Sequence, residues 1–220
     1  MTSGRDRILG EVRAQLARCP EVTPGAVEPH HGPRSTDELS EPKLVAAFEA
    51  RLKSVGGHVH HVADADAAAR MVEQLADEHG AGTLGVSDST QLEAVRRTSS
   101  RQLLGPDSDR DALLACDVGV TSAQAGIAET GSLLLVSRDE QHRLISLLPP
   151  VHIAILPAGD ITATLGDGFA LARGDEDPPP AAITLITGPS RTADIELTLV
   201  VGVHGPKELH VILVADPAGT

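Results

Sequence analysis

The hydrophobic positions of this chain alternate between two spacings, which predict helices and strands in turn. Two segments carry apolar residues three and four positions apart, as amphipathic helices do: Ile8, Leu9, Val12 and Leu16, then Leu44, Val45, Phe48 and Leu52. We expect the second helix to end at Gly56-Gly57. A further helical pattern covers residues 160–173. Short apolar runs predict strands at residues 58–62, 83–86, 118–121, 132–136, 151–156, 183–187 and 209–214.

This order of elements predicts an α/β fold with a Rossmann-like layered sheet. The sheet should be mostly parallel, because parallel neighbours need crossover connections that cover both of its faces. The shorter connection between residues 136 and 151 leaves room for an antiparallel pairing there. Residues 20–40 hold four prolines and few large apolar side chains, as linkers do. We therefore predict an N-terminal helix and linker arm over residues 1–40 and one α/β domain over residues 41–220.

Charge and composition exclude several classes of partner. The 18 basic and 31 acidic residues among 220 give a net charge of −13, which disfavours nucleic acid and anionic lipid. The chain has no Trp or Tyr and only two Phe, so it lacks stacking platforms for bases. No apolar run is long enough to span a bilayer or to form the core of a signal peptide. We expect a cytoplasmic protein with no membrane span.

Cysteine and histidine positions give little support for bound metal. Cys19 and Cys116 are isolated from each other, so neither a disulfide framework nor an iron–sulfur site follows, and Cys116 should be a buried small side chain. His58 and His60 fall on one face of a predicted strand, which makes a metal pair geometrically possible. No third ligand lies nearby in the sequence. We therefore expect no metal site.

Residues 188–196 combine turn formers with groups that bind anions. Gly188, Ser190, Arg191 and Asp194 follow the predicted strand 183–187, and we expect a helix to begin among them. At the carboxyl end of a parallel strand, these groups would face a ligand crevice and bind a small anionic metabolite. His204, beside Gly205-Pro206, is placed to hydrogen-bond at the crevice rim. The alternative is an ordinary strand-to-helix turn.

A second candidate is Glu129, a carboxylate in a glycine-flanked turn before an apolar strand. It could accept a proton, bind a hydroxyl or act as a nucleophile, with Thr130, Gly131 and Ser132 binding the ligand and amides donating to an oxyanion. The alternative is a solvated glutamate in a hairpin turn. Arg143 could grip a carboxylate or phosphate with two hydrogen bonds. Residues 85–90 could present amides to an anion, but they lack the spacing of a P-loop.

Four segments together resemble one known family. They are Ala-Glu-Thr-Gly-Ser at residues 128–132, Leu-Leu-Pro-Pro-Val-His-Ile at 147–153, Gly-Pro-Ser-Arg-Thr-Ala-Asp-Ile-Glu at 188–196 and Gly-Val-His-Gly-Pro-Lys-Glu-Leu-His at 202–210. In order and spacing, from about residue 85 to 214, the chain is similar to the lactate utilization protein C family, the LUD domain. The resemblance implies a fold like that of CoA transferases, sugar-phosphate isomerases and formyltetrahydrofolate cyclo-ligase.

The resemblance also implies a function. It suggests a subunit of a bacterial L-lactate oxidation system that forms pyruvate beside two other proteins, at least one carrying iron–sulfur clusters, with no cofactor on this chain. The alternative is an autonomous enzyme, CoA-transferase-like or acting on a sugar phosphate, that uses Glu129. The glycine-rich segment that stabilises the oxyanion in CoA transferases is missing here. A third possibility is a scaffold protein without catalytic activity, whose N-terminal helix docks on a partner. The chain could also form a homo-oligomer.

Overall fold

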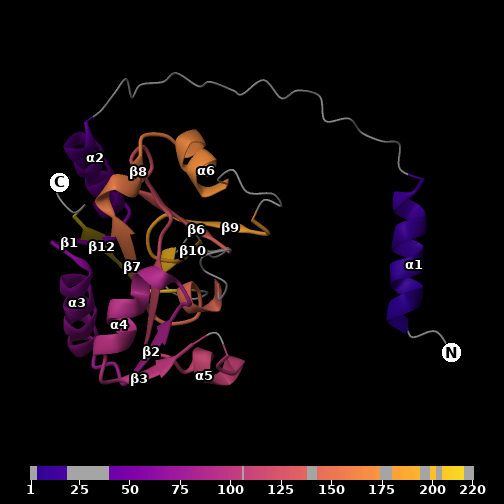
Figure 1. Cartoon of the computed structure of the whole chain (residues 1–220), viewed down its shortest axis with the longest axis horizontal. Coiled ribbons are helices and arrows are strands. Elements are labelled where there is room, and N and C mark those ends of the chain that lie inside the picture. The colour runs from indigo at the N-terminus through magenta and orange to yellow at the C-terminus, as the bar shows by residue number, and fades with distance from the viewer. Residues whose placement is uncertain are drawn as a thin grey trace. The chain divides into compact units, whose positions relative to one another are not determined.

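The computed structural model describes residues 4–18, 40–105, 107–137, 143–173, 180–193, 199–201 and 205–215. Contacts divide the chain into two units, Met1–Asp37 and Glu38–Thr220. The first unit contains helix α1 (Gly4–Leu16; Figure 1). Its side chains Ile8, Leu9 and Val12 are exposed. The predicted boundary at residue 40 stays a prediction. No helix among the described residues is long and apolar enough to cross a membrane.

The second unit is built on a six-stranded sheet whose strands all run in one direction (Figure 1). In spatial order, the strands are β1 (His58–Val62), β12 (Glu208–Val214), β7 (Val151–Pro157), β4 (Val118–Ser122), β2 (Thr83–Val86) and β3 (Gln102–Leu104). All five positions of β4 and six of the seven positions of β7 are buried, as expected for a parallel sheet covered on both faces. The predicted mostly parallel α/β fold is confirmed.

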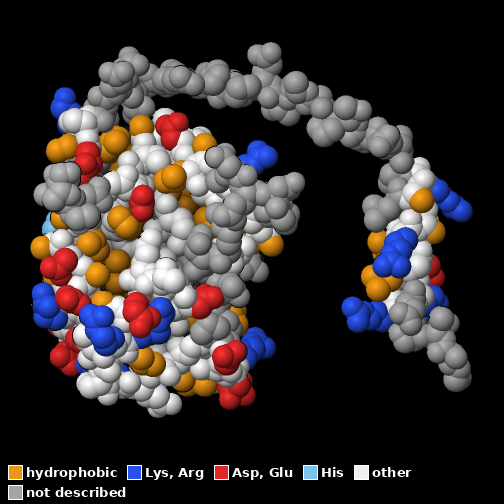
Figure 2. All heavy atoms as spheres, viewed as in Figure 1, with side chains coloured by type: hydrophobic (Ala, Val, Ile, Leu, Met, Phe, Trp, Pro, Cys, Tyr) orange, Lys and Arg blue, Asp and Glu red, His pale blue; other side chains and the backbone are white. Residues whose placement is uncertain are grey.

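Helices cover the two faces of this sheet. Helices α3 (Ala65–Glu78) and α4 (Glu93–Thr98), with the 3₁₀ turn η1 (Thr90–Leu92), lie on one face. Helix α3 begins where the Asp64 carboxylate accepts a hydrogen bond from the Ala67 amide at 2.7 Å. Over α3 and α4, acidic and basic side chains lie side by side at the surface (Figure 2). Helix α2 (Glu41–Ser54) packs on the other face through Phe48 and Leu52.

A second, four-stranded sheet packs against the α2 face. Its order is β8 (Ile161–Thr162), β5 (Ala125–Ile127), β6 (Ser132–Val136) and β9 (Ile183–Ile186), and β6 is antiparallel to both of its neighbours. Helix α6 (Leu165–Arg173) covers the far side of this sheet. The connections include α5 (Arg110–Leu114), η2 (Arg143–Ser146) and η3 (Ala158–Asp160). The antiparallel pairing that the sequence left open therefore belongs to a separate sheet.

One expected element is wrong. Strand β9 belongs to the antiparallel sheet, and the chain after it enters another strand, β10 (Arg191–Ala193), which pairs antiparallel with β11 (Leu199–Val201). No helix begins at residues 191–193, because the backbone there pairs with a second apolar segment instead of closing helical turns. The residues after Gly188 therefore do not lie at the carboxyl end of a parallel strand.

Candidate functional site

The chain reverses its direction of travel across the parallel sheet at β2. From β2 it moves outward to β3 through α4, and then returns through α5 to β4 on the other side of β2. The loop that leaves β2 enters η1 and α4 on the α3 face, whereas the chain that leaves β4 enters the second sheet on the α2 face. The loops that leave β2 and β4 therefore diverge. In open α/β sheets, a reversal of this kind at the carboxyl ends of the strands is where ligands bind.

Hydrogen bonds join the two diverging loops. The Ser122 hydroxyl donates to the Ser89 hydroxyl at 2.9 Å and accepts from the Gln124 amide at 2.8 Å. The other end of the Gln124 amide accepts from the Val136 amide at 2.7 Å. Ser89 and Ser122 are both buried. This network links the end of β2, the end of β4 and strand β6 of the second sheet.

Arg96 of α4 holds the loop after β2 from outside. Its Nη1 donates to the Ser87 carbonyl and its Nη2 to the Ser89 carbonyl, each at 2.6 Å. Ser87 is 1% exposed, and its hydroxyl has no hydrogen-bond partner within the described part of the chain. Arg96 therefore fixes the backbone of the loop, and the Ser87 hydroxyl beside it is buried without a described partner.

Two hollows lie on either side of this loop. One, of about 310 Å³, is lined by Val86, Ser87, Asp88, Arg96, Leu103, Leu104 and Gly105. The other, of about 280 Å³, is lined by Ser89, Thr90, Gln91, Gln124, Val136, Asp160, Leu171 and Ala172. The first places the Arg96 guanidinium, the Ser87 side chain and the Asp88 carboxylate beside apolar residues, and Arg96 is the group there that could bind the carboxylate of a small ligand. We call this first hollow, which lies beside the switch point between the ends of β2 and β3, the switch-point hollow.

The predicted turn around Glu129 has structural contacts in the second sheet. The Glu129 carboxylate accepts a hydrogen bond at 2.6 Å from the amide of Leu165, the first residue of α6, so it caps that helix. Gly131 has φ +69°, and a side chain there would lie 2.4 Å from the Leu52 amide nitrogen. Ser132 is buried, and its hydroxyl is 2.7 Å from the Thr187 hydroxyl. Thr130 Oγ1 has no hydrogen-bond partner among the described residues.

The predicted cluster after β9 rests on the C-terminal end of α2. Gly188 has φ +82°, and a side chain there would lie 2.9 Å from the Val55 carbonyl oxygen. Arg191 is exposed and donates from Nη2 to that same carbonyl. The Ser190 amide donates to the Pro206 carbonyl at 2.9 Å. Each of these contacts has a structural reading: Arg191 satisfies a carbonyl at a helix end, and Gly188 permits close packing.

The structure brings both predicted clusters to the C-terminal end of α2, and the Ser132–Thr187 hydrogen bond links their segments. Gly131 approaches Arg51 and Leu52, and Gly188 approaches Val55, yet no described contact connects Glu129 with Arg191. None of the predicted site residues that the structure describes lines either hollow. Asp194, His204 and the side chain of Arg143 lie outside the described residues. The proposed roles of these residues stay predictions.

Comparisons with known proteins now identify the family. The family model of the LUD domain matches residues 45–214. The chain belongs to the LUD domain family. It is 32% identical to a lactate utilization protein C of Exiguobacterium over 97% of each chain, and 30% identical to one of Shouchella clausii over 98% of this chain and all of that one. A crystal structure of a DUF162 family protein from Deinococcus radiodurans is 26% identical, with a TM-score of 0.58, and covers 80% of this chain and 99% of that one.

The matched LUD domain includes α2 from residue 45 onward, the switch-point hollow and both predicted clusters, and it leaves α1 outside. Within its core, burial raises the pKa of the Cys116 thiol, and Cys116 is confirmed as a buried side chain. Burial lowers the pKa of His152 to about 4, and its Nε2 lies 2.9 Å from the Thr121 hydroxyl. Burial, followed by the charges of His58 and His60, lowers the pKa of His210 to about 4.

Proposed function

We propose that this chain is a subunit of a bacterial L-lactate utilization system, in which lactate is oxidised to pyruvate in the cytoplasm beside iron–sulfur partner proteins. Support comes from relatives named lactate utilization protein C that align with the chain almost from end to end. An iron–sulfur cluster typically takes four cysteine thiolates, and this chain has two cysteines. The redox cofactors therefore belong to the partner subunits in this proposal.

The observation that carries a ligand-binding role is the switch-point hollow. A 2-hydroxy acid or 2-oxo acid offers a carboxylate for the Arg96 guanidinium and an oxygen for the Ser87 hydroxyl. A guanidinium has five N–H donors, and the bonds of Arg96 to the loop leave some for a ligand. At about 310 Å³, the hollow is at the small end of the range for ligand pockets. These features support a small anionic metabolite as the ligand.

Growth on lactate tests the proposed function directly. A host strain that lacks this chain should fail to grow on L-lactate and should grow normally on pyruvate, because pyruvate enters metabolism after the missing step. Restoring the wild-type chain should restore growth on lactate. Unimpaired growth of the deletion strain on L-lactate as the sole carbon source would disprove the role.

A second experiment tests the hollow separately. Gly105 lines it, and a Cβ added there would meet no atom within 4 Å, so we expect Gly105→Leu to obstruct the hollow without disturbing the core. Gly82, at the opposite end of β2, also has room, since only an Asp117 oxygen lies near, at 3.8 Å. We expect the complemented strain to lose growth on lactate with Gly105→Leu and to keep it with Gly82→Leu. Equal growth of the two variants would remove the hollow from the proposal and leave the subunit role standing.

A further inference from the structure

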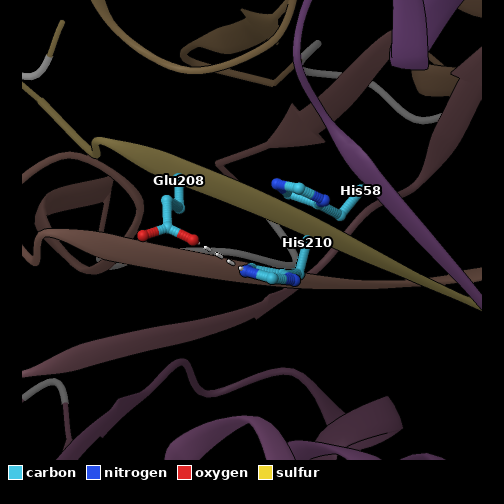
Figure 3. A group of neighbouring side chains, drawn as sticks. All are labelled: His58, Glu208 and His210. Atoms are coloured by element: carbon cyan, nitrogen blue, oxygen red, sulfur yellow. Dashed lines mark ion pairs between the residues drawn. The ribbon is translucent and has the colours of Figure 1, made fainter. Parts of the chain in front are cut away.

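Four histidines and a glutamate gather at the amino edge of the parallel sheet, at the opposite ends of the strands from the switch-point hollow. His58 opens β1, and it is the register partner of His210 in β12. Glu208 is the first residue of β12, and its carboxylate points toward the His210 ring (Figure 3). The His58 ring stacks on the His210 ring. His79 follows α3 and packs against His210 edge-on. Segments separated by about 150 residues therefore meet in one place.

The spacing of the polar atoms is that of ligands around an ion. Glu208 Oε2 lies 3.6 Å from His210 Nε2 and 3.8 Å from His79 Nε2. Three potential ligand atoms lie within 4.8 Å of one another, one each from His58, Glu208 and His210. These separations are too long for hydrogen bonds. Two ligands at zinc distances of ~2.0–2.1 Å in a tetrahedron lie about 3.3 Å apart, so small side-chain rotations suffice.

His210 is oriented to present a free nitrogen. Its Nδ1 is 3.1 Å from His60 Nε2, whereas its buried Nε2 has no hydrogen-bond partner among the described residues. If Nδ1 carries the proton and donates it to His60, the lone pair of Nε2 points toward Glu208. Metal-ligating histidines use their second ring nitrogen in this way, with a neighbour that fixes the tautomer and the ring.

We propose that His58, Glu208 and His210 form a binding site for a divalent transition metal ion of the zinc class. His79 supplies a fourth ligand, and His60 is a positioning residue that acts through His210. Imidazole with one carboxylate favours zinc and its neighbours over calcium or magnesium, which prefer oxygen ligands throughout. The C-terminal end of α3, which precedes His79, carries partial negative charge and further favours a cation.

The site would tie the edge of the sheet together. β1 is the edge strand, and the ion would join it to β12 and to the end of α3. Because an ion that binds only the folded chain shifts the folding equilibrium, the metal should raise the unfolding temperature. This inference does not depend on the lactate role.

Metal titration of the full-length chain tests the site. The protein should be prepared without a polyhistidine tag, stripped with EDTA and dialysed, then titrated with Zn²⁺ by calorimetry and with Co²⁺ by visible absorption. We expect one tightly bound ion per chain and the absorption of a four-coordinate nitrogen and oxygen site, with no comparable binding of Mg²⁺. His58→Ala and Glu208→Gln should each abolish stoichiometric binding. His60→Phe should weaken it about 10- to 100-fold.

His61→Ala is the matched control. His61 lies on the same strand but faces the other way, with its Nε2 3.3 Å from the Glu49 carboxylate of α2, so its loss should leave the titration unchanged. Circular dichroism checks that each variant folds. Should His58→Ala fail to fold, Glu208→Gln decides, because that carboxylate is 45% exposed. The absence of saturable Zn²⁺ binding by the wild type, or wild-type affinity in Glu208→Gln, would overturn the proposal.

Discussion

The two ends of the parallel sheet differ in how their polar groups are satisfied. At the carboxyl edge, Ser89, Ser122 and Gln124 form a closed set of hydrogen bonds, and Arg96 is bonded to the backbone. At the amino edge, Glu208 faces imidazoles at 3.6 and 3.8 Å, beyond hydrogen-bond distance. The carboxyl ends of the strands therefore form a rigid wall beside a hollow. The amino ends carry potential ligand atoms with space between them. Because β7 and β12 are each seven residues long, the switch-point hollow and the histidine cluster lie roughly 20 Å apart.

Rigidity and binding capacity both depend on whether the polar groups already have hydrogen-bond partners within the protein. A polar group with all its partners contributes to stability, whereas a group without them binds a ligand or carries a desolvation cost. Mutations in the Ser89, Ser122 and Gln124 network at the carboxyl edge should therefore act mainly through stability. The amino edge should respond mainly through binding.

The largest effect on stability should come from Arg96→Met. Two charge-assisted hydrogen bonds to the loop after β2 are lost, and we expect the free energy of unfolding to fall by about 2–4 kcal/mol. Arg97→Met is the control, because that side chain is 61% exposed and pairs only with Asp66 among the described contacts; its loss should cost less than about 1 kcal/mol. Urea unfolding measures both. Equal losses would show that the loop does not depend on Arg96.

His152 should produce an effect of similar size that depends on pH. Its pKa is about 4 in the folded chain against an ordinary value of 6.5, so the unfolded chain binds more protons between these pH values. Stability is therefore full above pH 6.5 and falls as the pH drops toward 4, by roughly 3 kcal/mol in total. His152→Gln should flatten this part of the profile of unfolding free energy against pH. An unchanged slope in the variant would contradict the assignment to His152.

Much of the fold could be predicted from local patterns. Apolar runs located β2, β4, β7 and β12, and the spacing of Phe48 and Leu52 located α2. The start of β10 could not be predicted in this way, because the turn formers after Gly188 suit a helix or a strand equally, and pairing with β11 decided between them. Local propensity is a weak guide where long-range pairing competes with it.

The sites were harder to predict than the fold, for the same reason. The segment 85–90 indicated an anion site, but nothing in the sequence connected it with Arg96 or Ser122, since those contacts depend on the topology. His58 and His60 indicated a metal pair without a third ligand. In the proposed site, His58 is joined by two ligands on β12, Glu208 and His210, and the pairing of β1 with β12 brings them near.

Ser122→Ala should have a moderate effect at the carboxyl edge. It removes the hydroxyl that connects Ser89 with Gln124 in a fully buried position, and we expect a loss of about 1–2 kcal/mol. Ser54→Ala removes an exposed hydroxyl that donates to the Arg51 carbonyl, and it should cost less than about 0.5 kcal/mol. Chemical denaturation of the pair measures the difference. A cost for Ser122→Ala no larger than that of the control would mean that the network is not a rigid wall.

The smallest effect should be that of Glu208→Gln in metal-free protein. The carboxylate is 45% exposed and its nearest imidazole nitrogens are 3.6 and 3.8 Å away, so removing its charge should change stability by less than about 0.5 kcal/mol. With Zn²⁺ at 100 times the dissociation constant, the wild type should gain about 2.7 kcal/mol and the variant nothing. Thermal unfolding with and without Zn²⁺ separates the two contributions. A large loss in metal-free Glu208→Gln would instead make the amino edge an ion-paired structural cluster like the carboxyl edge, because the carboxylate would then already be satisfied by protonated histidines.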